Sequence, residues 1–156
     1  MSYKILFVCL GNICRSPLAE GIMRKLIVDN NLAIEVDSAG TSSFHIGEAP
    51  DKRTMNNAKK HQVDLSHLCA RQFTAFDFDK FDKIYVMDKT NLSNVLSLTT
   101  DQYQQQKIEL FLNELYPKQN KEVPDPYFGG EKGFEDVFQM TYDTCKLICD
   151  KITKTV

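Results

Sequence analysis

The chain has 156 residues, a length typical of one domain, and we expect a single domain over residues 1–156. Hydrophobic residues make up 42% and charged residues 26% of it, as in an ordinary soluble globular protein. Nineteen basic and twenty-one acidic side chains leave a net charge of −2, which argues against nucleic acid and anionic membranes as partners. No apolar run reaches the roughly 20 residues of a membrane span, and the short one after Met1 lacks a signal peptide's cleavage site. A cytoplasmic location is therefore expected.

The cysteines point to the same compartment. An odd and sparse set is unlike the even sets of disulfide-rich secreted chains, and it favours a reducing cytosol. The spacing also lacks the second Cys-x-x-Cys or His-containing pair of a zinc site, so we expect no metal. The five cysteines are Cys9, Cys14, Cys69, Cys145 and Cys149.

The first predicted element is a strand at residues 4–8, which are apolar nearly throughout, as in a strand covered on both faces. Ser16 and Pro17 then predict the start of a helix, with Ser16 as its N-cap. Apolar side chains at helical spacing predict its buried face: Leu18, Ile22, Met23, Leu26 and Ile27.

Strand and helix patterns continue to alternate along the rest of the chain. In order, they predict a strand at 34–38, a loop at 39–51, a helix from Pro50 to about His61, a strand at 81–87, a helix capped by Asp88 and running to about Leu98, an edge strand at 107–112, a loop at 123–133 and a long amphipathic helix from Phe134. This alternation predicts an α/β fold of three layers, α/β/α, around a central four-stranded parallel sheet. Ligands of such sheets bind beyond the carboxyl ends of the strands, which directs attention to residues 9–16.

Residues 9–16 carry a cysteine, five further residues and an arginine, followed by a hydroxyl. The segment follows the first strand and contains Gly11 and Asn12, which tolerate unusual backbone angles, before it enters a helix. Successive backbone N–H groups in such a turn form an anion cradle, and the helix N-terminus adds partial positive charge. The segment therefore predicts a phosphate-binding loop directly after the first strand.

Arg15 and Cys9 give this loop its chemistry. The planar guanidinium of Arg15 can hold two phosphoryl oxygens at once. The same positive field favours the thiolate form of Cys9, to which Ser16 could donate a hydrogen bond. A glycine-bearing turn of this kind also binds phosphate without catalysis in many α/β proteins, so the loop alone leaves both interpretations open.

A second feature lies far away, at residues 123–128. Asp125 stands between two prolines, on a stiff loop that fixes its carboxyl group. Hydrolysis through a thiolate needs an acid for the leaving oxygen and later a base for water, and one carboxyl group can serve as both. Tyr127 and Phe128 could wall a slot for an aromatic leaving group. The alternative is that Asp125 only forms a turn.

Several segments together carry a resemblance. Residues 9–17 read Cys-Leu-Gly-Asn-Ile-Cys-Arg-Ser-Pro, and the segments 37–40, 70–72, 86–88 and 125–127 follow at matching places. In these segments, and along essentially the whole chain, the sequence resembles the low-molecular-weight protein tyrosine phosphatases. Residues 9–17 match the phosphate-binding loop of that family residue for residue.

The resemblance implies hydrolysis of phosphotyrosine in proteins, without metal or cofactor, in an enzyme whose loop also takes inorganic phosphate and other oxyanions. It implies that Cys9 is the nucleophile, Arg15 the phosphate clamp and Asp125 the general acid and then base. Reversible pairing of Cys14 with the nucleophile under oxidation is also implied. The remaining expected substrate-binding residues are Leu10, Gly11, Asn12, Ile13, Cys14, Ser16, Phe44, Tyr127 and Phe128, with Asn12, Ser16 and Ser38 supporting the loop through hydrogen bonds.

The chain departs from the family pattern at three places. His67 stands one position before the family's usual histidine, at whose place Leu68 is found, so its support of the loop is an open question. Phe44 occupies a rim position that often holds tryptophan or tyrosine. Phe128 replaces a second tyrosine and removes one possible phosphorylation site.

Two other functions share parts of this pattern. A thioredoxin-coupled arsenate reductase has the same loop, but it needs further cysteines near the middle of the chain, and residues 73–88 contain none. A phosphate-binding protein or phosphocysteine carrier would use the loop without hydrolysis, and would have no need of Arg15 and Asp125 together. The natural substrate and the oligomeric state are not encoded in these motifs.

Overall fold

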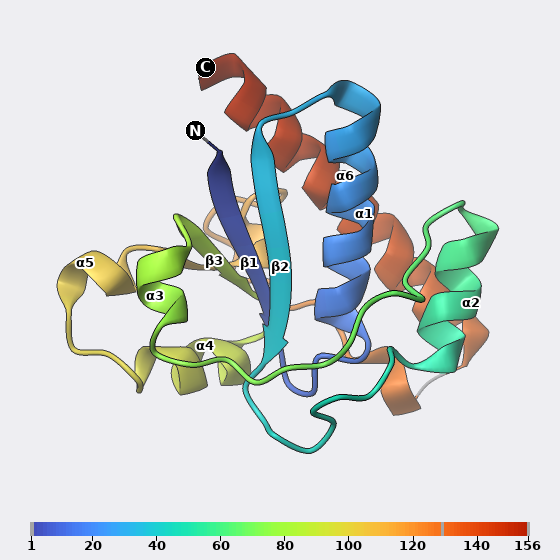
Figure 1. Ribbon diagram of the computed structural model, residues 1–156, viewed down its shortest axis with the longest axis horizontal. Coiled ribbons are helices and arrows are strands. Elements are labelled where there is room, and N and C mark those ends of the chain that lie inside the picture. Colours follow the sequence, from blue (N-terminus) through green and yellow to red (C-terminus); the bar gives the residue numbers. More distant parts are fainter. Residues whose placement is uncertain (1, 129, 156) are drawn as a thin grey trace.

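Four parallel strands form the centre of the protein (Figure 1). The structure is a computed structural model that describes residues 2–128 and 130–155. The sheet has the order β2-β1-β3-β4, and its strands span Tyr3–Cys9 (β1), Ile34–Gly40 (β2), Lys83–Val86 (β3) and Ile108–Leu110 (β4). This arrangement confirms the predicted four-stranded parallel sheet, with the fourth strand at its edge.

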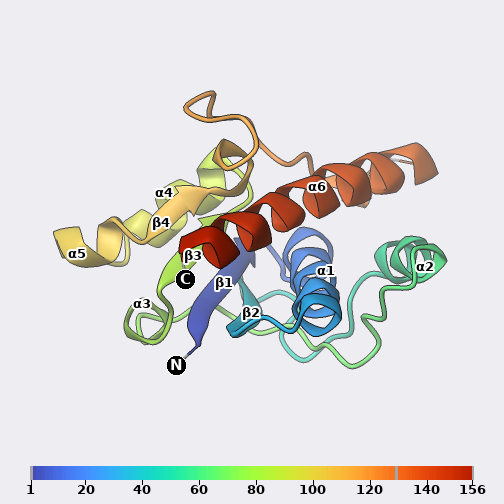
Figure 2. The same ribbon diagram turned by 90° about the horizontal axis from the view of Figure 1, so that it is seen from above.

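Helices cover both faces of the sheet, which confirms the three-layer α/β/α fold (Figures 1 and 2). On one face, Ile5 and Phe7 of β1 share a core with α1 (Arg15–Asn30) and α6 (Glu131–Thr155). On the other face, Leu6 and Val8 pack with residues of α3 (Asp77–Lys80) and α4 (Lys89–Leu96). Alternate side chains of β1 therefore enter two different cores, which explains why its sequence is apolar throughout.

The predicted capping of α1 was wrong. The helix begins at Arg15 after an N-cap at Cys14, and Ser16 lies inside its first turn. The Ser16 hydroxyl is instead engaged by Asn12 and by the sulfur of Cys9, so it is not available to the first helical N–H groups. The buried face of α1 was predicted correctly, since Leu18, Ile22, Met23 and Leu26 are buried and Ile27 is partly buried.

The helices after β2 follow the predicted order with shifted ends. Asp51 caps α2 (Lys52–Lys60), and Asp88 caps α4 as predicted. The last helix begins three residues before Phe134, so residues 131–133, predicted as the end of a loop, are helical. Two single-turn helices had no periodic signal in the sequence: α3 and α5 (Gln102–Gln105).

The strand ends lie at one edge of the sheet. Residue pairing places Cys9 of β1 beside Gly40 of β2, and Val8 beside Val86 of β3. The segments that follow these strands therefore meet at this edge. In the described part of the chain, none of the helices combines the length and apolar character needed to cross a membrane.

Candidate active site

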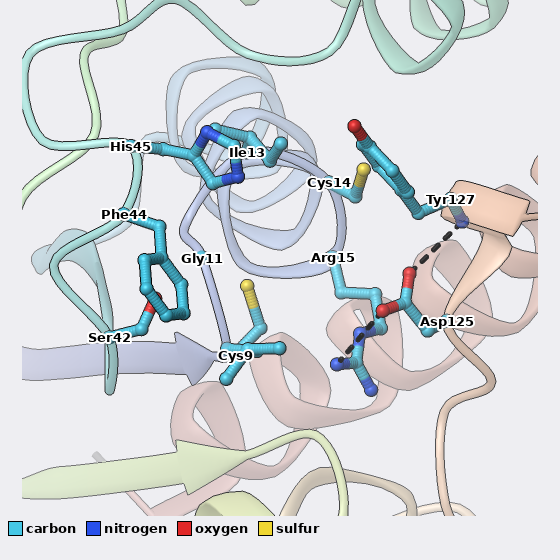
Figure 3. A pocket seen from close by; sticks show the side chains of 11 residues that line it. Cys9, Gly11, Ile13, Cys14, Arg15, Ser42, Phe44, His45, Asp125 and Tyr127 are labelled. Atoms are coloured by element: carbon cyan, nitrogen blue, oxygen red, sulfur yellow. Dashed lines mark hydrogen bonds and ion pairs between the residues drawn. The ribbon is translucent and has the colours of Figure 1, made fainter.

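The predicted phosphate-binding loop borders a pocket of about 170 Å³ at this edge (Figure 3). Residues 10–14 connect Cys9, the last residue of β1, to the start of α1, so the backbone of the loop lies in front of the helix N-terminus. The pocket is lined by Cys9, Leu10, Gly11, Ile13, Cys14, Arg15, Ser42, Phe44, His45, Asp125 and Tyr127.

The sulfur of Cys9 lies at the base of the pocket. It accepts a hydrogen bond from the backbone N–H of Asn12 at 3.3 Å, and it lies 3.0 Å from the hydroxyl of Ser16. Cys9 is only 3% exposed, so the pocket is its route to a ligand. Hydrogen-bond donors around a sulfur stabilise its anionic form, which is the nucleophilic one.

Asn12 fixes the shape of the loop. Its φ of 58° lies in the left-handed region, which asparagine tolerates better than most residues. Its side-chain amide donates to Ser16 Oγ at 2.7 Å and to Ser38 Oγ at 2.9 Å, and its Oδ1 accepts from the backbone N–H of Arg71 at 3.0 Å. The side chains of Asn12 and Ser16 thus support the loop together with Ser38. Neither residue lines the pocket, although both were predicted to bind substrate.

This network ends at a buried carboxylate that sequence reasoning missed. Glu20 is 3% exposed and accepts a hydrogen bond from Ser38 Oγ at 2.7 Å. Its other oxygen is paired with Arg24, at 2.7 Å from Nη2. The i,i+4 spacing of Glu20 and Arg24 was visible in the sequence, but the contact with β2 was not.

His67 lies outside this network. It is exposed, and Leu68, which occupies the family's usual histidine position, packs against the core. The loop is instead tied to the 70–72 segment through the backbone of Arg71. Among the described residues, no hydrogen bond joins the His67 side chain to the loop.

Arg15 is held rigidly beside the pocket. Its Nη1 donates to Asp88 Oδ2 at 2.7 Å and to the carbonyl oxygen of Val123 at 2.9 Å. Burial lowers the pKa of the guanidinium, but the nearby Cys9 and Asp88 outweigh it, so that the pKa is raised and Arg15 stays charged. Asp88 was predicted as a helix cap and lies in segment 86–88 of the resemblance, but its contact with Arg15 was not predicted. Its Oδ1 does cap α4, through the N–H of Asn91, while Oδ2 holds Arg15.

Asp125 reaches the same pocket from the loop before α6. Its Oδ2 lies 3.9 Å from Arg15 Nη2, and its Oδ1 accepts the backbone N–H of Tyr127 at 3.0 Å (Figure 3). The side chain is 38% exposed, which leaves it open to a ligand and to water. The pocket thus brings Cys9 and Arg15 together with Asp125, which lies 110 or more positions later in the sequence.

Apolar side chains form the mouth of the pocket. Leu10, Phe44 and Tyr127 are exposed there, Phe44 by 80%, while Ile13 is buried in the wall. The 3-10 helix Pro126–Phe128 ends at Phe128, whose side chain lies outside the described part of the structure, so its predicted role stays a prediction.

Two lining residues were not among the predicted site residues, although one of them, His45, lies in the loop segment 44–48 that was expected to form the rim. Nδ1 of His45 is hydrogen-bonded to Oε2 of Glu48 at 3.0 Å. The His45 ring also lies against Gly11, where an added Cβ would come within 2.9 Å of the ring. Ser42 Oγ is buried without a hydrogen-bond partner among the described residues. A single histidine, and a serine between Thr41 and Ser43, give no specific sequence signal for either position.

Cys14 is chemically distinct from Cys9. Burial raises the pKa of the Cys14 thiol to about 12, so Cys14 is protonated at neutral pH. We expect iodoacetate at pH 7 to modify Cys9, whose sulfur faces the anion pocket, much faster than Cys14, with inorganic phosphate protecting Cys9. Peptide mass spectrometry measures both rates, and the exposed Cys69 serves as the reference thiol. Equal rates at Cys9 and Cys14 would contradict this assignment.

Gly40 is required by the close approach of the loop to β2. A Cβ at this position would lie 2.7 Å from the carbonyl oxygen of Leu10 and 3.0 Å from the backbone nitrogen of Asn12. We expect Gly40→Ala to lower the free energy of unfolding by about 1–3 kcal/mol, the usual cost of overpacking, and to weaken inhibition by phosphate. Urea unfolding and phosphate titration measure the two effects.

Gly133→Ala is the matched control for this prediction, because a Cβ there meets nothing within 4 Å and the residue is helical. It should leave inhibition by phosphate unchanged, and the free energy of unfolding should be unchanged or slightly higher. Equal behaviour of the two variants would show that the loop does not depend on Gly40.

Within the described residues, no group of three or more His, Cys, Asp or Glu side chains is placed to hold a metal ion.

Comparison with known proteins relates this site to one family. The family profile described as low molecular weight phosphotyrosine protein phosphatase matches residues 4–156. The rat protein of that name, from Rattus norvegicus, is 42% identical over 153 residues, which cover 96% of each chain.

Solved structures show the same likeness. A protein tyrosine phosphatase from Entamoeba histolytica, crystallised with Hepes in the active site, is 40% identical with a TM-score of 0.91, covering 99% of each chain. A Drosophila arginine phosphatase is 33% identical with a TM-score of 0.88, covering 96% of this chain and 97% of its own. With a profile match over nearly its full length and relatives above 40% identity, the chain belongs to the low molecular weight phosphotyrosine protein phosphatase family.

Proposed function

We propose that the protein hydrolyses phosphotyrosine in other proteins through a phosphorylated Cys9. The sulfur of Cys9 attacks phosphorus, the bond from phosphorus to the phenolic oxygen breaks, and Asp125 gives its proton to that oxygen. Water then attacks the phosphocysteine, Asp125 takes a proton from it, and the sulfur–phosphorus bond breaks to release inorganic phosphate. Each step balances without a cofactor.

The observation that carries this proposal is the meeting of three groups at one pocket. A sulfur that accepts a backbone hydrogen bond lies at the base, a buried guanidinium lies beside it, and a half-exposed carboxyl lies 3.9 Å from that guanidinium. Arg15 and the loop amides would hold the equatorial phosphoryl oxygens while Asp125 faces the leaving group. The Entamoeba histolytica relative holds Hepes in its active site, and Hepes contains a sulfonate, an anion similar in shape to a phosphoryl group. This supports the binding of a phosphoryl group in the pocket described here.

The walls of the pocket suit an aromatic leaving group. Leu10, Ile13, Phe44 and Tyr127 present apolar or aromatic surface at the mouth, which suits the ring of phosphotyrosine. Asp125 is the only carboxylate among the lining residues of the pocket in the described structure. A phosphoarginine substrate, as the name of the Drosophila relative suggests for that protein, would have Asp125 as the one carboxylate partner for its guanidinium among these residues.

The test compares phosphorylated substrates in the presence of a chelator. We expect turnover of p-nitrophenyl phosphate and of phosphotyrosine peptides without added metal, and competitive inhibition by vanadate. Phosphoserine peptides and phosphoarginine should be poor substrates. Faster turnover of phosphoarginine than of phosphotyrosine would overturn the substrate assignment, and dependence on a metal would overturn the mechanism.

Two other activities find less support. Arsenate reduction needs a relay of thiols, but Cys69, the exposed cysteine of the chain, is not among the pocket-lining residues. A phosphocysteine carrier would keep its phosphoryl group, and Asp125 beside the loop favours its hydrolysis instead. Thioredoxin oxidation that depends on arsenate, or a stable phosphocysteine on the wild-type protein, would favour these alternatives.

A further inference from the structure

A cation outside the pocket contacts the aromatic wall that adjoins Asp125. Arg53 lies in the first turn of α2, with its guanidinium carbon 5.2 Å from the centre of the Tyr127 ring. The same carbon lies 4.8 Å from the centre of the Phe134 ring, which is buried at the start of α6. Arg53 is not among the residues that line the pocket, so it has no direct place in the proposed chemistry.

Asp51 fixes the guanidinium between these rings. Its carboxylate accepts from Nε and Nη2 of Arg53 at 3.2 and 3.1 Å, and it also caps α2 through the backbone N–H of Arg53. Asp51 is in turn anchored to the phosphate-binding loop, because its backbone N–H donates to the carbonyl oxygen of Ile13 at 2.8 Å. The start of α2 therefore contacts both the phosphate-binding loop, at Ile13, and the ring of Tyr127.

Tyr127 transmits this contact to the carboxyl group. Its backbone N–H is held by Asp125 Oδ1 at 3.0 Å, and both side chains lie on the same side of the pocket in Figure 3. A shift of the Tyr127 backbone would therefore displace the N–H group that donates to Asp125. We propose that Arg53 is a positioning residue, which holds Tyr127 and with it the Asp125 carboxyl in register with the phosphate-binding loop.

The consequence for catalysis depends on the leaving group. This inference rests on the proposed function, in which Asp125 protonates the leaving oxygen. A basic leaving group such as tyrosine needs that proton in the transition state, whereas p-nitrophenolate leaves with little help. A misplaced acid therefore slows phosphotyrosine more than p-nitrophenyl phosphate, whereas a general loss of folding slows both equally.

Arg53→Met tests this difference, because it keeps a long apolar side chain and removes the charge. Since a cation–π contact at an exposed site is worth a factor of roughly 2 to 5, we expect kcat/KM to fall about 5-fold for phosphotyrosine and less than about 2-fold for p-nitrophenyl phosphate. Inhibition by inorganic phosphate should be unchanged, because Arg53 does not line the anion pocket. Arg53→Lys keeps a cation over the rings and should recover part of the loss.

Two comparisons separate positioning from other roles. Lys59→Met removes an exposed cation from the same helix and should change neither substrate. In an Asp125→Ala background, Arg53→Met should cause little further loss, because the group that it positions is gone. Equal losses with the two substrates, or the same loss in both backgrounds, would overturn the inference. Failure of the wild-type protein to hydrolyse phosphotyrosine would instead overturn the proposed function.

Discussion

Replacing Cys9 by serine is expected to abolish turnover of phosphotyrosine while binding of phosphate persists. A serine hydroxyl stays protonated at neutral pH, and the groups next to this position, the N–H of Asn12 and the hydroxyl of Ser16, are not placed as bases. The loop amides and Arg15 are untouched, so the anion site remains. We expect turnover to fall by more than about 10⁴-fold, as when a covalent nucleophile is lost. Calorimetry should still detect binding of vanadate or phosphate to the variant.

Cys69→Ser is the matched control, since it makes the same change at an exposed cysteine that does not line the pocket. It should retain full activity. Substantial turnover by Cys9→Ser would rule out a phosphocysteine route. Loss of both turnover and anion binding would show that the sulfur is needed for the shape of the loop.

Replacing Asp125 by alanine is expected to have the second largest effect. A positioned general acid contributes roughly 10²–10⁴-fold to rate, and Asp125 is the carboxyl group that lines the pocket. The loss in kcat/KM should be largest for phosphotyrosine and smaller for p-nitrophenyl phosphate, which needs less protonation. Steady-state kinetics over a series of aryl phosphates measures this dependence.

Asp143→Ala, at an exposed position on α6, controls for the loss of a surface carboxylate and should be silent. A loss of under threefold in Asp125→Ala with a basic leaving group would remove Asp125 from the role of acid. Equal losses across the series would assign it to support of Arg15, 3.9 Å away, instead of proton transfer.

The parts of the fold that could be predicted are those whose pattern repeats. The residues of β1 enter two cores, and the apolar face of α1 recurs over several turns, so both are visible in one sequence. A single turn such as α3 has no period to detect. At Ser16 the local signal was misleading. Serine suits an N-cap, but the Ser16 hydroxyl lies 3.0 Å from Cys9 Sγ and supports the site instead.

The site divides in the same way. Cys9 and Arg15 could be predicted because their motif is contiguous, and Asp125 because two prolines isolate it. Glu20 and Asp88 could not, because their site contacts depend on how β2 and β3 align beside β1. Each carries a local signal that explains it without the site, an i,i+4 ion pair for Glu20 and a helix cap for Asp88.

The most direct test is to locate phosphorus during turnover. Mixing the Asp125→Ala variant with p-nitrophenyl phosphate, quenching in acid and mapping the peptides by mass spectrometry would show where the phosphoryl group resides. We predict one phosphoryl group, on the sulfur of Cys9, which forms at the rate of p-nitrophenolate release and disappears as phosphate is released. A phosphoryl group on another side chain, or product formation with no phosphorylated protein at any time, would contradict the account.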